Sequence, residues 1–272
     1  MRKSYLNISL LILFIASIPL LNACKDEEGN NRINLNLFTV QDDVAFGAQV
    51  AHEIDSNVRE YPPLDSATHV EAYGHIERIT ATILASGKVK YQDDFAWKVK
   101  ILDDDSVLNA FCTPGGYIYV YTGLIKFLDS EDQLAGVMGH EIAHAAERHS
   151  TEALTKQFGT ELLFAILLGE NQGALAEVAK GMLGLKYSRT NESESDRRSV
   201  EYLYETEYDA RGVARFFEKI VEAGGSGVPE FLSTHPSPER RVEDILARWT
   251  ALGAKTGGTF EDRYKQFKQS LD

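Results

Sequence analysis

The amino-acid sequence predicts an α+β domain that is mainly helical and contains one small sheet. Apolar residues recur at helical spacing over residues 41–59 and 68–86, and the chain beyond residue 130 has only helical and loop patterns. Residues 95–101 alternate apolar and polar side chains as a half-buried strand does, and 106–110 and 117–121 are further strand candidates. With 43% hydrophobic residues, the 272-residue chain can bury one sizeable core.

Residues 1–23 have the layout of a secretory signal peptide rather than of a folded element. Two basic residues precede an apolar run at 8–21, which is shorter than the ~20 residues that span a bilayer. Residues 21–24 (LNAC) resemble a bacterial lipobox, in which Cys24 is lipidated and becomes the first residue of the mature protein. Ordinary signal cleavage beside an incidental cysteine is the alternative.

An acidic and polar linker at 24–40 leads into the domain, which we expect at 41–252, followed by a C-terminal tail at 253–272. The linker begins with KDEE at 25–28, which looks like the surface-export tag of lipoproteins in some Gram-negative bacteria, although a solvated tether explains the same charges. We therefore expect an outer membrane lipoprotein that is anchored through lipid at Cys24 and faces the periplasm or the cell surface.

The overall charge and the cysteine count exclude two classes of protein. A net charge of −13 argues against a nucleic-acid partner, because binding phosphates requires a basic face. Two cysteines cannot build a disulfide-rich scaffold, and Cys112 has no partner if Cys24 carries lipid.

The central motif is HEIAH at residues 140–144. Ser130 precedes it and Gln133 follows three residues later, a spacing typical of a capping box that begins a helix. Residues four apart lie on one helix face, so His140 and His144 can bind one metal ion, while Glu141 can accept a proton from a metal-bound water. A structural pair of histidines is the alternative.

A third metal ligand is expected about fifty residues downstream. Catalytic zinc takes three protein ligands and keeps one position open. Ser188 can cap a helix on which Glu192 and Asp196, four residues apart, share one face. One carboxylate could bind the metal while the other accepts the N–H of a ligand histidine. A solvated acidic helix start, favoured by the helix dipole, is the alternative.

Other nearby residues are not expected to bind the metal. Glu194 lies about 200° from Glu192 on a helical wheel. His149 is five residues after His144 and lies off the ligand face, so we interpret it as a structural or surface residue.

With these motifs the sequence resembles the HtpX-like and CAAX-prenyl-protease-like zinc metallopeptidases over roughly residues 42–249. The resemblance implies a zincin-like domain of the gluzincin type that binds one zinc ion. In the family motif E-x-x-A-D the glutamate is the third zinc ligand, which is Glu192 here, and the aspartate beside the ligands is Asp196. Ser195 replaces the usual alanine of that motif.

Residues 109–116 (NAFCTPGG) match the family pattern N-A-F-x-x-P-G-G. The resemblance implies that this strand and turn border the active-site cleft, where an exposed strand edge can pair with a peptide substrate. An ordinary core hairpin is the alternative. The matching positions are Asn109, Ala110, Phe111, Gly115 and Gly116.

The family segment H-P-x-x-x-x-R is matched by His235 and Arg241. His235 could donate to the oxyanion that develops during hydrolysis, or it could take the fourth position on zinc in a resting state in which its loop plugs the cleft. The same residues also read as a helix N-terminus, with Ser237 as the cap and Pro238 at the first helical position.

We therefore expect a zinc-dependent endopeptidase in which Glu141 activates a zinc-bound water. The resemblance implies polypeptide substrates among misfolded or unassembled envelope proteins, with envelope assembly machinery as a further partner. Two interpretations compete: a lipid-anchored chaperone-like or assembly protein with a zinc site but little proteolysis, and a structural zinc site that His235 closes. The intact Glu141 favours the enzyme, because a pure binding site needs no general base.

Overall fold

The computed structural model describes residues 24–25, 31–32, 36–223, 229–235 and 238–272. The chain divides into two compact units, residues 1–35 and residues 36–272. In the first unit, β1 (Cys24–Lys25) pairs antiparallel with β2 (Asn31–Arg32). The predicted signal peptide at 1–23 lies outside the described residues.

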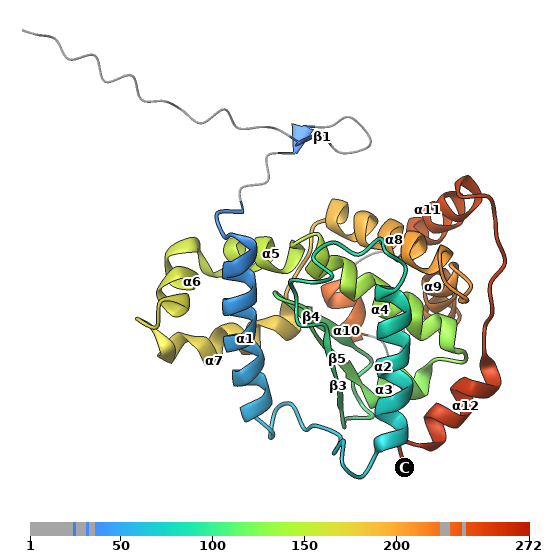
Figure 1. The fold of residues 1–272 in the computed structure, drawn as a ribbon, viewed down its shortest axis with the longest axis horizontal. Coiled ribbons are helices and arrows are strands. Elements are labelled where there is room, and N and C mark those ends of the chain that lie inside the picture. Colours follow the sequence, from blue (N-terminus) through green and yellow to red (C-terminus); the bar gives the residue numbers. More distant parts are fainter. Residues whose placement is uncertain (1–23, 26–30, 33–35, 224–228, 236–237) are drawn as a thin grey trace, which may run out of the picture. The chain divides into compact units, whose positions relative to one another are not determined.

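The second unit is mainly helical and is built around one small sheet of three strands, which confirms the predicted fold class. Helices α1, α6 and α7 lie at one end of the unit, and α8, α9 and α11 gather at the other (Figure 1). The elements are α1 (Val40–Ser56), α2 (Val70–Leu84), β3 (Lys98–Leu102), β4 (Ala110–Thr113), β5 (Tyr117–Tyr121), α3 (Thr122–Phe127), α4 (Glu131–Ala146), α5 (His149–Phe158), α6 (Thr160–Leu167), η1 (Gln172–Ala174), α7 (Leu175–Gly181), η2 (Met182–Gly184), α8 (Arg189–Tyr204), α9 (Gly212–Glu222), α10 (Pro229–Thr234), α11 (Pro238–Ala251) and α12 (Glu261–Gln269).

Two strand predictions were wrong in their bounds, for local reasons. The strand expected at 95–101 begins only at Lys98, because Trp97 takes a left-handed backbone conformation with φ 44°. The stretch expected at 106–110 is not a strand before Ala110. Instead, the Asp104 carboxylate accepts the backbone N–H of Ser106 at 2.9 Å and holds a turn there.

The sheet has the order β3-β5-β4, with β5 parallel to β3 and antiparallel to β4. Phe111 faces Tyr119 across the antiparallel pair. The connecting turn requires glycine, since Gly115 and Gly116 have φ values of 74° and 83°. In this order β4 lies at one edge of the sheet, but all four of its residues are buried, so the exposed edge expected for a peptide substrate stays a prediction.

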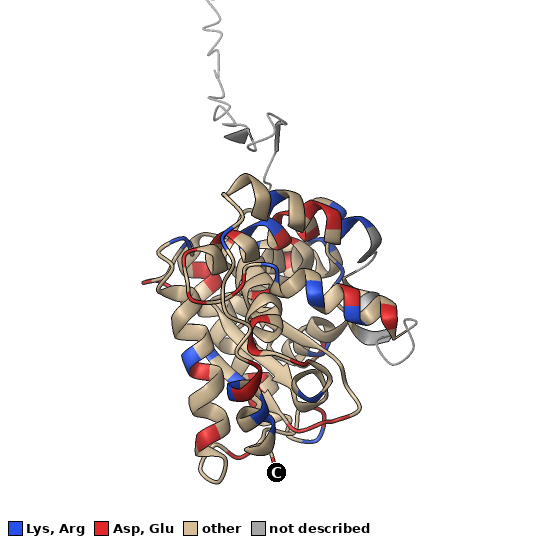
Figure 2. Cartoon of the chain, turned by 90° about the vertical axis from the view of Figure 1, so that its right-hand side faces the viewer, with Lys and Arg blue, Asp and Glu red and all other residues tan. Residues whose placement is uncertain are grey.

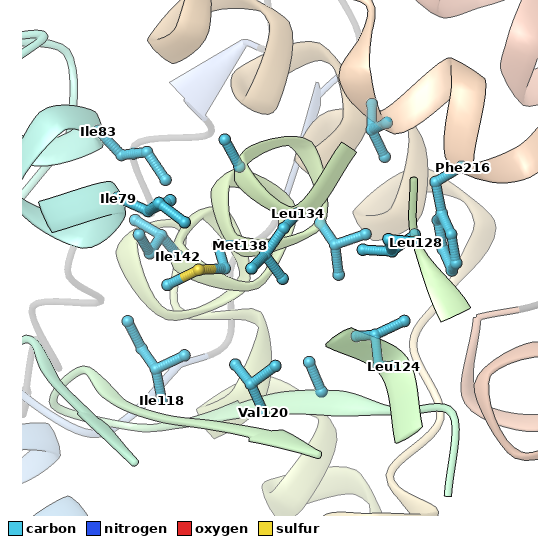
Figure 3. Close-up of a cluster of buried hydrophobic side chains, with 14 of the residues drawn as sticks. Ile79, Ile83, Ile118, Val120, Leu124, Leu128, Leu134, Met138, Ile142 and Phe216 are labelled. Carbon is cyan, nitrogen blue, oxygen red and sulfur yellow. The ribbon is translucent and has the colours of Figure 1, made fainter. Parts of the chain in front are cut away.

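Helix α4, which carries the HEIAH motif, is buried at every one of its 16 positions. Its apolar side chains fill the space between α2 and the sheet (Figure 3). Two glycines of α4 let neighbouring helices approach closely. A Cβ on Gly136 would lie 2.2 Å from the backbone nitrogen of Val213 in α9, and a Cβ on Gly139 would lie 2.9 Å from the side-chain oxygen of Ser199 in α8. The members of this buried cluster that Figure 3 labels include Leu134, Met138 and Ile142 of α4, Ile79 and Ile83 of α2, and Ile118 and Val120 of β5.

The start of α4 is where the sequence predicts it, but the capping box does not form. Ser130 occupies the cap position without capping the backbone, and its hydroxyl donates to Asp132 at 2.6 Å. Gln133 accepts the backbone N–H of Asp129 instead. The backbone N–H of Glu131, which has no partner within the helix, donates to the carbonyl of Thr259 at 3.0 Å.

The C-terminal segment at 253–272, expected as a tail, packs within the second unit and holds this end of α4. The fully buried carboxylate of Glu131 accepts hydrogen bonds from Arg78 at 2.7 Å, from Arg263 at 2.5 Å and from the hydroxyl of Tyr208 at 2.6 Å. In α12, the hydroxyl of Tyr264 donates to the carbonyl of Ile125 at 2.7 Å.

Lys and Arg are interspersed with Asp and Glu along the helices (Figure 2). Among the described residues, no single helix is long and apolar enough to cross a membrane. Residues 160–167 and 172–184 satisfy the length and composition criteria only as a pair, and the chain bends by 112° between them.

We expect Glu131→Ala to destabilise the domain by about 3–5 kcal/mol, because it leaves two arginines next to a buried site without their shared partner. Urea unfolding followed by circular dichroism measures this change. Glu261→Ala, at an exposed position of α12, is the matched control and should shift stability by less than about 0.5 kcal/mol. Equal effects of the two substitutions would contradict the role given to Glu131.

Candidate metal centre

The two histidines of the HEIAH motif lie on one face of α4, one turn apart. Their Nε2 atoms are 3.0 Å from each other, and both side chains are fully buried. The predicted pair is therefore arranged as two ligands of a single ion would be.

Helix α8 brings two carboxylates to this pair. Ser188 caps the helix as predicted, because its hydroxyl accepts the backbone N–H of Asn191 at 3.1 Å. Glu192 places one oxygen 3.4 Å from His144 Nε2 and the other 3.6 Å from His140 Nε2. On the next turn of the helix, Asp196 Oδ1 lies 2.9 Å from His140 Nδ1.

A third histidine, His235, directly follows α10 and reaches the same point. Its Nδ1 atom lies 2.9 Å from Glu192 Oε1 and 3.3 Å from His140 Nε2. The four ligand atoms offered by His140, His144, Glu192 and His235 all lie within 4.8 Å of one another.

Arg241 of α11 connects the two carboxylates of α8. Its guanidinium group donates to both oxygens of Asp196, at 2.6 and 2.7 Å, and lies 2.8 Å from Glu192 Oε2. It also stacks on the ring of Phe217 at 4.2 Å. Burial alone would raise the pKa of Asp196, but the positive charge and hydrogen bonds of Arg241 lower it.

This arrangement fixes which atoms carry lone pairs. An ionised Asp196 only accepts hydrogen bonds, so His140 donates through Nδ1–H and keeps a lone pair on Nε2. Burial would raise the pKa of Glu192, but the three surrounding histidines lower it, so that its carboxylate is ionised too. Two imidazole nitrogens and a carboxylate that point at one spot fit zinc, whose catalytic sites use this donor set.

Glu141 lies at the same site but is not part of the ligand cluster. Both of its carboxylate oxygens are buried and have no hydrogen-bond partner among the described residues. One of these oxygens, Oε1, lies 3.5 Å from Nε2 of His235. Burial raises the pKa of Glu141 to about 7, which is suitable for a group that both accepts and returns a proton.

Comparison with known proteins agrees with this geometry. The model of peptidase family M48 matches residues 72–249, which is more than half of the chain and includes all of these site residues. The chain belongs to peptidase family M48. It is a metallopeptidase of that family with an intact group of zinc-binding residues, His140, His144 and Glu192.

Curated relatives come from bacteria and from mitochondria. The mitochondrial metalloendopeptidase OMA1 of Arabidopsis thaliana is 33% identical over 165 residues, covering 60% of this chain and 34% of the relative. The beta-barrel assembly-enhancing protease of Escherichia coli is 31% identical over 179 residues, covering 60% and 37%. The OMA1 of Saccharomyces cerevisiae is 30% identical over 167 residues, covering 58% and 48%. The matches thus span about a third to a half of the length of these relatives.

In this M48 domain β4, the strand predicted to border the cleft, is connected through side chains to the metal-ligand residues. The residues expected to form it lie in β4 and its turn, and Asn109 immediately precedes β4 and accepts the N–H of Ala110 at 2.9 Å. The carbonyl of Cys112 accepts the hydroxyl of Ser150 at 3.0 Å. That hydroxyl lies 3.2 Å from the Tyr187 hydroxyl, and the Tyr187 ring stacks on His144 at 3.7 Å between centroids.

Sequence reasoning missed one residue of the M48 site, Tyr187, and it interpreted His149 as a structural or surface residue outside the ligand set, where the structure also places it. His149 is only 1% exposed, so it is not a surface residue, and its Nδ1 atom lies 3.2 Å from His144 Nδ1. Arg148 has a left-handed backbone, φ 62°, which ends α4 and lets His149 begin α5. A helical wheel continued from His144 therefore gives no information on the contact of His149 with Nδ1 of His144. The sequence offers one indication that Tyr187 lies near the site, namely that it directly precedes Ser188, the predicted cap of the helix that carries Glu192.

We expect Glu192→Ala to lower zinc affinity by at least about 100-fold, because it removes one of three ligands of the metallopeptidase. Competition with a chromophoric chelator measures this affinity. Glu177→Ala, at an exposed position of α7, is the control and should bind zinc as the unmodified protein does. Undiminished affinity of the Glu192 variant would rule out the assigned ligand set.

Proposed function

We propose that the protein is a zinc-dependent endopeptidase that hydrolyses peptide bonds of envelope proteins. The observation that carries the proposal is the position of Glu141. It is a buried carboxylate, without a hydrogen-bond partner among the described residues, directly beside the converging His140, His144 and Glu192. A purely structural metal site has no need of such a group.

A zinc ion bound by these residues would lower the pKa of a water molecule and polarise a substrate carbonyl. Glu141 takes the proton of the attacking water and passes it to the leaving amine, and its pKa near 7 suits both transfers. Asp196 keeps His140 in the tautomer that leaves Nε2 unprotonated, and Arg241 keeps Asp196 ionised. A substrate bound as an added strand along β4 would bring its backbone to this site.

The cellular setting is part of the proposal. The apolar run at 8–21 and the LNAC sequence that ends at Cys24 support a lipoprotein of the outer membrane. The Escherichia coli relative is a beta-barrel assembly-enhancing protease, which supports misfolded or unassembled envelope proteins as substrates and assembly machinery as a partner. The OMA1 relatives are mitochondrial, so kinship within the family leaves the compartment open.

We further propose that His235 occupies the fourth ligand position in a resting enzyme. Its Nδ1 atom belongs to the four-atom cluster, and its ring stacks on Phe231 at 4.5 Å between centroids. His235 is 2% exposed and Glu192 is 2% exposed, so a substrate reaches the site only after this histidine moves away.

We expect Glu141→Gln to keep zinc binding but to lower hydrolysis by roughly 10²–10⁴-fold, because glutamine cannot accept the proton. Zinc content and casein digestion, measured on the full-length chain in detergent, test both parts. Zinc in both proteins and cleavage by the unmodified protein alone would support the endopeptidase. Equal cleavage by the two proteins would exclude Glu141 as the base, and zinc without cleavage by either would favour a chaperone-like zinc protein.

For His235→Ala we expect casein hydrolysis to increase several-fold, since the fourth position becomes available while three ligands remain. Phe127→Ala, a partly buried substitution outside the four-residue ligand cluster, controls for nonspecific loosening of the domain. A loss of activity in the His235 variant would instead support a role in stabilising the oxyanion. Unchanged activity would contradict both roles.

A further inference from the structure

The two ligand histidines of α4 differ in what their outer ring nitrogens contact. Nδ1 of His140 faces a carboxylate, Asp196, at 2.9 Å. Nδ1 of His144 faces another imidazole, Nδ1 of His149, at 3.2 Å. All of these rings are buried, so Nδ1 of His144 needs a hydrogen-bond partner within the protein, and Nδ1 of His149 is within reach to be that partner.

Proton positions follow from the ligand role of His144. A neutral imidazole carries one N–H, so a lone pair on Nε2 of His144 requires the proton on Nδ1. That N–H then donates to Nδ1 of His149, which must carry a lone pair. The proton of His149 therefore lies on Nε2, which makes no hydrogen bond among the described residues but lies 3.4 Å from the carboxylate oxygen Oε2 of Glu194.

Helix α8 supplies partners on both sides of the site. Glu192 and Asp196 face the ligand histidines of α4, whereas Glu194 and Ser195 face His149. Ser195 Oγ lies 3.3 Å from Nδ1 of His149, so this hydroxyl is a second polar neighbour of the accepting nitrogen. The serine at this position thus has a contact that the usual alanine of the family motif would lack.

We propose that His149 is a positioning residue that fixes the tautomer and the ring orientation of His144 as a zinc ligand, while the negative charge of the nearby Glu194 favours a proton on Nε2 of His149. The inference rests on the proposed zinc site and adds residues that do not touch the metal. A carboxylate that orients a ligand histidine is a common arrangement at zinc sites. Here an imidazole is inserted between the carboxylate and the ligand.

Two substitutions of His149 separate this role from simple packing. His149→Asn keeps an acceptor at the place of Nδ1, whereas His149→Leu fills similar space but offers none. We expect the leucine variant to lose zinc affinity by roughly 10–100-fold and the asparagine variant to stay within about threefold of the unmodified protein. If His149 only fills space, the apolar leucine should perform as well as asparagine or better, and this result would overturn the inference.

The tautomer can be observed directly in the full-length chain with ¹⁵N-labelled histidine. In the zinc-loaded protein we expect Nδ1 of His144 to be protonated and its signal to shift in the leucine variant but not in the asparagine variant. A His144 signal that is unaltered in the leucine variant would overturn the inference.

Folding is checked by thermal unfolding of the metal-free proteins. If the leucine variant does not fold, Glu194→Gln takes its place, and we expect an affinity loss of roughly threefold or more, against no loss in Glu177→Ala. Unchanged affinity in Glu194→Gln would then contradict the inference. Failure of the unmodified protein to bind zinc would instead contradict the proposed function itself, so the two failures are distinguishable.

Discussion

The guanidinium group of Arg241 holds the two carboxylates of α8 together, and the ionised state of Asp196, and through it the tautomer of His140, depends on this buried contact. Burial by itself favours the neutral form of a carboxyl group. A neutral Asp196 could not require His140 to donate through Nδ1, and the lone pair directed at the metal position would be lost. One residue that binds no metal therefore determines whether His140 is in the correct protonation state.

The cost of this arrangement is that Arg241 itself is buried, at 5% exposure. A buried cation is tolerated only when it is paired and hydrogen-bonded, and here Asp196 and Glu192 provide both. The ring of Phe217 covers the guanidinium face at 4.2 Å, so that α9 also takes part in holding α11 against α8. The catalytic and structural roles of these helices are thus not separable.

Much of the site could be predicted from sequence because its residues have regular helical spacing. His140 with His144, and Glu192 with Asp196, each lie one turn apart on a continuous helix, so counting residues places them correctly. Counting does not predict the contact of His149 with His144, because α4 has ended and the left-handed Arg148 precedes the start of α5.

Other features depend on contacts between segments that are distant in sequence. The start of α4 is held by the carbonyl of Thr259, more than a hundred residues downstream, rather than by the adjacent Ser130 and Gln133. A local pattern contains no information about such a partner, and for the same reason the segment at 253–272 looked like a tail. The stacking of Tyr187 on His144 is likewise a product of the tertiary fold.

The close approach of α9 and α8 to the glycines of α4 has a consequence for how a substrate enters. Gly136 has no room for even a methyl group, because the backbone nitrogen of Val213 occupies that space, and α4 is enclosed along its whole length. A helix enclosed in this way can neither slide nor rotate without breaking the core around it. We therefore expect α4 to keep its place when a substrate binds, so that any opening of the site involves the segments that surround it.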